Sequence, residues 1–227
     1  MTYTLITANR NYSSWSLRPW VLMKALGIGF TDRLELFAQP DNYDAFRQFS
    51  HSGQVPVLLD GDRGIADSLA IALYLAERHP GVWPADEAAR IFAQGTVAEM
   101  HGGFGHLRGD CPMNVGVRVS PKPMSIGLQR NVARLREIFE QGLAQFGGPW
   151  LAGTGFSAVD AFYAPVAFRI RTYGLDVGKG QAWVDLILAH PAMLDWEAQA
   201  LAEDWREVSH EEELAATGVV TADYRAA

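Results

Sequence analysis

The chain has 227 residues, with 19 Lys and Arg against 26 Asp and Glu, so its formal net charge is −7. A hydrophobic content of 48% is enough for a buried core and argues against global disorder. An acidic chain without a basic run is a poor nucleic-acid binder. Because Cys111 is the single cysteine, no disulfide can form within the chain.

Targeting signals are not apparent in the sequence. There is no secretion signal, and no apolar run reaches the roughly 18 residues needed to span a membrane. We therefore expect a cytoplasmic protein that binds neither a membrane nor a nucleic acid. The low cysteine content suits a reducing compartment.

Strand and helix signals alternate over residues 1–80. The order predicts βαβ, a short helix and then ββα. The expected strands are 2–7, 30–37, 55–59 and 64–66, and the expected helices are 15–26, 41–49 and 67–79. The last helix is apolar almost all round from Leu69 to Ala76, which predicts that it is buried.

The second part of the chain shows helical signals only. A linker at 80–84, rich in proline and glycine, separates it from the first part. The expected helices are 86–107, 124–146, 157–172, 181–189 and 191–203, with an irregular break at 109–123. Ser157 and Asp160 form a capping-box pattern at the start of one helix. We expect an α/β domain over 1–80 and an all-helical domain over 86–227.

Three serines lie at the junction between the first strand and the first helix: Ser13, Ser14 and Ser16. A helix N-terminus presents unpaired N–H groups and the positive end of the helix dipole. Serines at this position can cap the helix, or they can donate hydrogen bonds to an anion such as a thiolate. No cysteine lies in this segment, so a reactive thiol would have to arrive on a ligand.

Two further motifs also have two interpretations. The Val55–Pro56 bond can be an ordinary trans bond at a strand start; if it is cis, the backbone of Val55 is free to pair with a peptide ligand. Asp67 can be a simple helix cap, or it can accept from an ammonium group while Ser68 binds a carboxylate at the helix start.

The motifs and their order together resemble the cytosolic glutathione S-transferase family over nearly the whole chain. The segments that carry the resemblance are Ser13-Ser14-Trp15-Ser16, Ser50-His51-Ser52-Gly53-Gln54-Val55-Pro56-Val57-Leu58, Asp67-Ser68-Leu69-Ala70-Ile71 with Tyr74-Leu75, and Gly155-Phe156-Ser157-Ala158-Val159-Asp160. The resemblance implies a thioredoxin-like N-terminal domain with a mixed sheet, a helical C-terminal domain and a homodimer.

The resemblance also implies glutathione as co-substrate. Gln54 would reach its glycyl carboxylate, and Val55, preceding a cis Pro56, would pair with its cysteinyl part. Asp67 and Ser68 would hold its γ-glutamyl end. No metal is implied, and the five-residue spacing of two histidines in the next helix, His101 and His106, is poor metal geometry.

Among the classes of the family, the serine-type zeta class is locally the most similar. This similarity assigns thiol activation to Ser13, with Ser14 as the alternative, although Trp15 stands where that class has cysteine and His51 where proline is common. Lowering the pKa of a thiol from about 8.5 by about two units takes only about 2.7 kcal/mol. The serine need not be a nucleophile.

A pocket for a small electrophile is expected between the two domains. Its candidate residues come from the first long helix, the break after it and the capped helix: His101, Phe104, His106, Arg108, Met113, Asn114, Arg169 and Arg171. Each of them can equally be structural.

The sequence therefore favours a glutathione transferase in which a serine-stabilised thiolate attacks a small electrophile. One alternative is a glutathione-dependent isomerase of the maleylacetoacetate type, in which glutathione adds and leaves again. The other is a glutathione-binding protein without catalytic activity.

Overall fold

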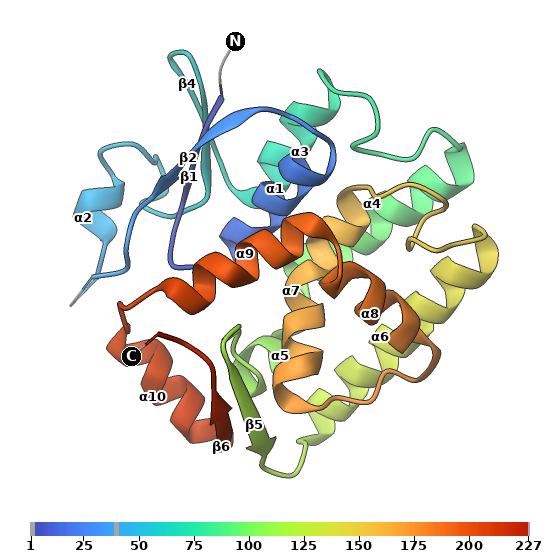
Figure 1. Cartoon of the computed structure of the whole chain (residues 1–227). Coiled ribbons are helices and arrows are strands. Elements are labelled where there is room, and N and C mark those ends of the chain that lie inside the picture. The colour runs from blue at the N-terminus through green and yellow to red at the C-terminus, as the bar shows by residue number, and fades with distance from the viewer. Residues whose placement is uncertain (1–2, 39–40, 227) are drawn as a thin grey trace.

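The computed structural model describes residues 3–38 and 41–226, so the ends of the predicted strand and domains at residues 1, 2 and 227 lie outside the described residues. An α/β unit is followed by a helical unit, as the sequence predicts (Figure 1). The elements of the first unit are β1 (Tyr3–Thr7), α1 (Ser14–Ala25), β2 (Phe30–Leu34), α2 (Tyr43–Phe46), β3 (Val57–Asp60), β4 (Arg63–Ala66) and α3 (Ser68–Ala76).

The four strands form one mixed sheet in the order β2-β1-β3-β4. β1 runs parallel to β2 and antiparallel to β3, with Leu5 opposite Leu58. β4 returns antiparallel to β3. Because β1 is central, Leu5 and Ile6 are fully buried. The hydrophobic side chains of α1, including Leu17 and Trp20, are buried in the core as well.

Several element ends differ from the predictions. β2 ends at Leu34 instead of residue 37, and α2 is a single turn instead of a helix over 41–49. β3 begins at Val57, after the proline that cannot donate to the ladder. The prediction that α3 is buried all round is wrong, because the side chain of Leu73 is 50% exposed while only one face of the helix packs inward.

The helical unit follows the predicted order of helices. Its helices are α4 (Glu87–Gly102), α5 (Gly105–Asp110), α6 (Ile126–Gln145), α7 (Ala158–Tyr173), α8 (Gln181–Leu188), α9 (Pro191–Ala202) and α10 (Val208–Thr217), with a 3-10 turn at Gly178–Gly180. No helix of the described residues is both long enough and apolar enough to cross a membrane.

α7 is the central helix of this unit and is buried over almost its whole length. Asp160 in its first turn accepts hydrogen bonds from the backbone N–H of Ser157 at 3.0 Å and of Leu151 at 3.0 Å. The indole of Trp183 donates to the same carboxylate at 2.9 Å. The predicted acid after the cap therefore joins three segments of the domain.

The predicted helix over 86–107 is divided. α4 ends at Gly102, and Phe104 adopts a left-handed conformation with φ 59 before α5 begins. A side chain at Gly103 would place its Cβ 2.6 Å from the carbonyl oxygen of Glu99, so the turn depends on a glycine there. The single long helix that the sequence suggests is therefore replaced by two helices.

The helical unit also contains a two-stranded antiparallel ribbon that the sequence analysis did not predict. β5 (Val117–Pro121) lies in the expected irregular break, and β6 (Gly218–Asp223) lies in the C-terminal tail. Gly218 allows the close approach, because a Cβ there would lie 2.2 Å from the Ser120 carbonyl oxygen. Figure 1 shows the ribbon beside α10, near the C-terminus. The ribbon thereby folds the tail back onto the body of the protein.

Candidate functional site

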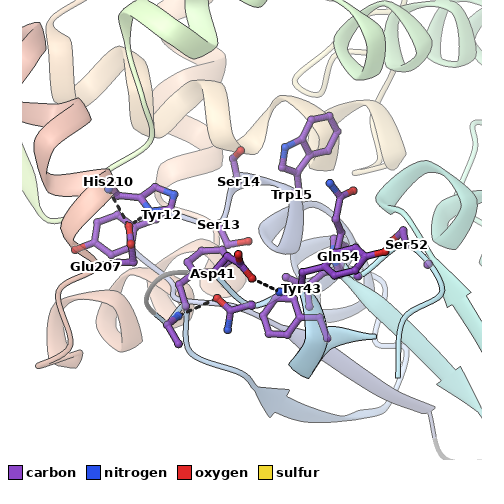
Figure 2. Close-up of a pocket in the computed structure, with 18 of the residues that line it drawn as sticks. Tyr12, Ser13, Ser14, Trp15, Asp41, Tyr43, Ser52, Gln54, Glu207 and His210 are labelled. Carbon is purple, nitrogen blue, oxygen red and sulfur yellow. Dashed lines mark hydrogen bonds and ion pairs between the residues drawn. The ribbon is translucent and has the colours of Figure 1, made fainter. Parts of the chain in front are cut away.

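A cavity of about 920 Å³ lies against the N-terminal end of α1. The α/β unit lines it with residues 12–15, 37–38, 41–43, 46, 52–56 and 66–68, and the start of α10 adds Glu207, Ser209 and His210. Figure 2 shows Ser13 between the α10 residues on one side and Tyr43 and Gln54 on the other. A cavity of this size accommodates a small-molecule ligand.

The predicted serines lie at the start of α1, and their hydroxyls differ in environment. Ser13 is the N-cap residue, but its side chain makes no capping hydrogen bond. The Ser13 hydroxyl donates to Oγ of Ser16 at 2.8 Å, and Ser16 Oγ also accepts from the backbone N–H of Ala8 at 3.1 Å. Ser14 is the first residue of the helix, and its hydroxyl has no hydrogen-bond partner within residues 3–38 and 41–226.

The loop before β3 presents backbone at the cavity. The Val55–Pro56 peptide bond is cis, which confirms that prediction. Val55 precedes the first paired residue of β3, where Val57 faces Ile6 of β1. Ser50 stabilises the loop, since its hydroxyl donates to the Gln54 carbonyl at 2.7 Å and accepts from the Gln54 N–H at 3.2 Å. The side chain of Gln54 remains exposed at the rim of the cavity.

Asp67 and Ser68 lie together where α3 begins. Asp67 caps the helix, because its Oδ1 accepts from the backbone N–H of Leu69 at 2.7 Å and of Ala70 at 3.2 Å. It does so with φ 84, a left-handed conformation that is uncommon outside glycine. The hydroxyl of Ser68 is buried and finds no partner in the described part of the chain. A polar ligand at the helix start would satisfy it.

Trp15 separates the cavity from α4. Its ring meets that of His101 edge to face at 5.3 Å, and the guanidinium of Arg108 lies 4.7 Å from its centre. Burial lowers the pKa of His101, and the nearby carboxylate of Asp67 opposes that effect. The distance from His101 Nε2 to Asp67 Oδ2 is 3.4 Å. Two of the predicted pocket residues therefore surround Trp15 and lie behind the cavity wall.

Two further predicted pocket residues, Phe104 and Arg171, lie elsewhere. Phe104 is buried in the helical domain against Tyr163. Arg171 forms a two-point ion pair with Glu197, with N–O distances of 2.9 and 2.6 Å. None of His101, Phe104, Arg108 and Arg171 is among the residues that line the large cavity. Their role toward an electrophile stays a prediction.

The remaining candidates make structural contacts. Arg169 is buried and donates from Nε to the Cys111 carbonyl at 2.8 Å. Met113 and Asn114 are buried as well, and His106 lies over Gly127 at the surface of α6. No cluster of three potential metal ligands occurs among residues 3–38 and 41–226.

The α10 side of the cavity was missed by the sequence analysis. Glu207 and His210 come from the tail, which the sequence presents as a charge run with few large apolar residues. The ring of His210 stacks on Tyr12 at 4.8 Å and on Phe37 at 5.2 Å. No local motif indicates these contacts, because their partners lie about 170 and 200 residues earlier in the chain.

Two family profiles match the chain. Residues 12–78 match the family described as glutathione S-transferase, N-terminal domain, and residues 127–199 match glutathione S-transferase, C-terminal domain. A glutathione transferase homologue from Burkholderia gl BGR1, solved with bound glutathione, superposes with a TM-score of 0.68 at 21% identity, over 88% of this chain and 98% of that chain. This likeness shows the fold.

Two curated relatives of different classes match at the same identity. A zeta-class glutathione S-transferase of Euphorbia esula is 28% identical over 58% of this chain and 60% of its own length. Glutathione S-transferase theta-1 of Homo sapiens is 28% identical over 79% of this chain and 76% of its own. The similarity to the zeta class is therefore not distinguished from that to the theta class. The two profile matches cover more than half of the 227 residues, in the order of the two domains, and the chain belongs to the glutathione S-transferase family.

Proposed function

We propose that the protein is a glutathione transferase in which a serine hydroxyl at the start of α1 stabilises the thiolate of glutathione. The supporting observation is that one cavity brings together the groups that a tripeptide thiol requires. These groups are the Ser13 and Ser14 hydroxyls, the backbone of Val55, and the start of α3 at Asp67 and Ser68. The solved relative with bound glutathione shares this fold.

Glutathione is expected to lie along these groups in one direction. Its γ-glutamyl carboxylate meets the buried hydroxyl of Ser68 and the positive end of α3, while Asp67 Oδ2 accepts from its ammonium group. Its cysteinyl backbone pairs with Val55, and Gln54 at the rim reaches the glycyl carboxylate. The sulfur then lies at the α1 start.

Ser13 is the proposed thiolate donor, and its bond to Ser16 is compatible with that role. Hydroxyl hydrogens rotate to suit their partners. If the Ser16 hydroxyl donates to Ser13 Oγ, the Ser13 hydroxyl is released to donate to sulfur while the 2.8 Å contact is kept. Ser14, whose hydroxyl has no partner within the described residues, is the alternative donor.

The proposed assembly is a homodimer in the cytoplasm. Two large apolar side chains are exposed on neighbouring elements of the two domains, Leu73 of α3 at 50% and Ile91 of α4 at 63%. Burying their exposed apolar surface against a second copy is favourable by about 25 cal/mol per Å². They support an interface along α3 and α4.

The test combines binding with turnover. Isothermal titration with glutathione should show a single site, and the bound thiol should absorb as thiolate near neutral pH. Activity is measured with 1-chloro-2,4-dinitrobenzene, a conjugated enone and a cis-enoic diacid. Consumption of glutathione supports the transferase, and isomerisation of the diacid without consumption supports the isomerase. Binding without any turnover supports a non-catalytic role, and the absence of binding would contradict all three.

A further inference from the structure

We propose that His210, oriented by Glu207, is a catalytic proton-transfer residue for the second substrate, and that this substrate is a conjugated carbonyl compound. The inference rests on the proposed function and deepens it. It assigns a chemical role to the wall of the cavity that the C-terminal helix supplies. Four independent features of the described residues support it.

The first feature is the fixed position of the His210 ring. Two aromatic rings enclose it, with Tyr12 at 4.8 Å and an interplanar angle of 24°, and Phe37 at 5.2 Å and 17°. Since Tyr12 immediately precedes Ser13 in the chain, the imidazole contacts the residue next to the proposed thiolate donor. Figure 2 shows His210 and Tyr12 together on one side of Ser13.

The second feature is a carboxylate that orients the ring. Oε2 of Glu207 lies 2.6 Å from His210 Nδ1 and also accepts from the His210 backbone N–H at 2.8 Å and from the Ser209 hydroxyl at 2.7 Å. The side chain of Glu207 is only 5% exposed. A carboxylate at Nδ1 keeps the proton of the neutral imidazole on that nitrogen. Nε2 then carries the lone pair that can take up a proton.

The third feature is access from the cavity. The side chain of His210 is 30% exposed, and it lines the same 920 Å³ cavity as the α1 serines. Within residues 3–38 and 41–226, Nε2 forms no hydrogen bond. A group in the cavity can therefore reach the nitrogen that Glu207 leaves available.

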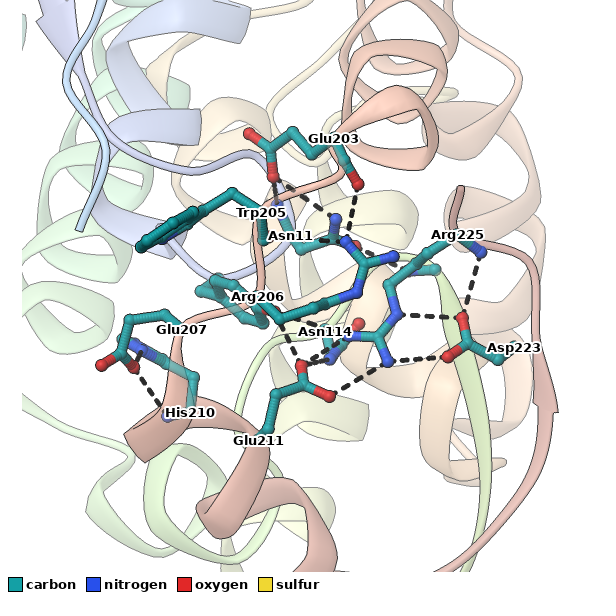
Figure 3. Close-up of polar contacts among 12 residues, drawn as sticks. Asn11, Asn114, Glu203, Trp205, Arg206, Glu207, His210, Glu211, Asp223 and Arg225 are labelled. Atoms are coloured by element: carbon teal, nitrogen blue, oxygen red, sulfur yellow. Dashed lines mark hydrogen bonds and ion pairs between the residues drawn. The ribbon is translucent and has the colours of Figure 1, made fainter. Parts of the chain in front are cut away.

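The fourth feature is the anchoring of α10, which keeps this wall in place (Figure 3). The buried guanidinium of Arg225 bonds Glu211 at 2.5 and 3.0 Å and Asp223 at 2.7 Å. The Tyr12 hydroxyl donates to Glu211 at 2.7 Å, and the indole of Trp205 donates to the Phe37 carbonyl at 2.9 Å. The helix is thus attached to Tyr12, and the segment just before it is attached to Phe37, so both residues that enclose the His210 ring are tied to this part of the chain.

The proton balance favours addition to a conjugated carbonyl. The thiol proton passes to Nε2 of His210, and Glu207 stabilises the imidazolium. Sulfur forms a bond to the β-carbon, the carbon–carbon π pair shifts to the bond between the α-carbon and the carbonyl carbon, and the carbonyl π pair moves to oxygen. The imidazolium then returns the proton to this enolate. No further reactant is needed. Displacement of chloride, by contrast, leaves a weakly basic anion that needs no proton.

The experiment compares two electrophiles in matched variants. His210→Phe retains an aromatic ring between Tyr12 and Phe37 but cannot carry a proton. Its ratio of kcat/KM for a conjugated enone to kcat/KM for 1-chloro-2,4-dinitrobenzene should fall by about 100-fold, a typical acid–base contribution. The same ratio should change little in His106→Phe, whose side chain is 60% exposed on α5. In His210→Ala, added imidazole should restore part of the enone rate.

The outcomes separate this inference from the proposed function. If the folded His210→Phe protein binds glutathione and the ratio stays as in the wild type, His210 transfers no proton, although the transferase assignment stands. If the wild-type protein turns over 1-chloro-2,4-dinitrobenzene but not the enone, the inference about His210 is wrong and the proposed function still stands. If glutathione does not bind to the wild type by calorimetry, the proposed function fails and this inference fails with it.

Discussion

Ser13 Oγ and Ser16 Oγ are 2.8 Å apart, and the second of these oxygens also accepts the backbone N–H of Ala8 at 3.1 Å. The hydroxyl proposed to face the thiol is therefore connected through Ser16 to the end of β1. Hydrogen bonds in such a chain polarise and strengthen one another. The pair gives the proposed donor a defined position at the helix start.

Ser13→Ala should leave glutathione affinity nearly intact and raise the pKa of the bound thiol. In the proposed arrangement the sulfur is the only atom of glutathione that this hydroxyl contacts, while Val55, Asp67 and Ser68 hold the rest of the tripeptide. Loss of a hydrogen bond to a charged group costs about 1.5–3 kcal/mol, or about one to two pKa units. Thiolate absorbance of the complex as a function of pH measures the shift.

Ser14→Ala is the matched control for this titration. If Ser14→Ala raises the thiol pKa and Ser13→Ala does not, then Ser14 is the activating residue. If neither substitution moves the titration, the assignment of the donor to Ser13 or Ser14 is wrong. Ser16 and the backbone N–H groups at the start of α1 would then remain as candidate donors.

Ser16→Ala should lower both stability and thiol activation. The substitution leaves the backbone N–H of Ala8 buried without an acceptor, which costs about 1–3 kcal/mol. It also removes the partner that orients the Ser13 hydroxyl. Ser16→Thr keeps a hydroxyl at the same position and should restore part of both properties. Urea denaturation and the thiolate titration are the measurements, and an unchanged Ser16→Ala protein would show that the contact is dispensable.

Two substitutions at Asp67 separate its capping role from ligand recognition. Asp67→Asn keeps an oxygen for the N–H groups of Leu69 and Ala70 and tolerates the left-handed φ of 84, so its stability should stay close to that of the wild type. The carboxylate charge is lost, and glutathione affinity should fall by about 1.5–3 kcal/mol, or about 10- to 100-fold.

Asp67→Ala should show the same loss of affinity together with about 0.5–2 kcal/mol of lost stability from the missing cap, and a further loss because alanine tolerates the left-handed φ of 84 less well. Calorimetric titration and thermal unfolding of both variants give the two quantities separately. Equal affinity of wild type and Asp67→Asn would remove this residue from the glutathione site and leave it a structural cap.

The α/β order could be predicted, and so could the cavity residues at 13–14, 54–56 and 67–68, because their signals are local. Apolar periodicity indicates the strands and helices, and the Val55–Pro56 and Asp67-Ser68 motifs lie within single turns or helix starts. The spacing of Val115, Val117 and Val119 is also a period-2 strand signal. The prolines of the same segment led to the prediction of an irregular break, and β5 was not predicted. Prolines are tolerated at the end of an edge strand, and β5 ends at Pro121.

The α10 wall could not be predicted, because it depends on contacts between distant residues. The tail is held by the pairing of β6 with β5, in which Val119 faces Val220, and by the bond from Tyr12 to Glu211. Neither segment carries a sequence pattern that indicates which distant segment it contacts. The exposure of Leu73 was missed for a related reason, since an apolar pattern alone cannot tell a buried apolar face from an exposed one.

Leu73→Glu and Ile91→Glu should each weaken the proposed dimer. Both side chains are exposed and apolar, so a carboxylate at either position costs little in the monomer but is unfavourable in an apolar interface. Sedimentation velocity over a range of concentrations gives the oligomeric state. Val219→Glu, on the exposed β6 strand away from α3 and α4, serves as the control. A wild-type monomer, or mutants that dimerise as the wild type does, would contradict the interface.

Acidification should release α10, because the pKa of Glu207 is held at about 2. Burial alone would raise this pKa, but hydrogen bonds from the His210 backbone, the Ser209 hydroxyl and the His210 ring outweigh it. The folded-state pKa therefore lies below the ordinary value of 4.5. The stabilisation is present above pH 4.5 and is lost as the pH falls toward 2, since the unfolded carboxylate binds its proton first.

Glu207→Gln removes the titrating group and should abolish this dependence. At each pH between 6 and 2, amide exchange of peptides covering Val208–Thr217 is compared between wild type and variant, so that the intrinsic pH dependence of exchange cancels. The protection of the wild type over the variant should shrink from pH 4.5 downward. Glu212→Gln, which alters an exposed side chain on the same helix, should retain the wild-type profile. If the difference in amide protection between wild type and Glu207→Gln stays constant across this range, Glu207 does not hold α10 against the cavity.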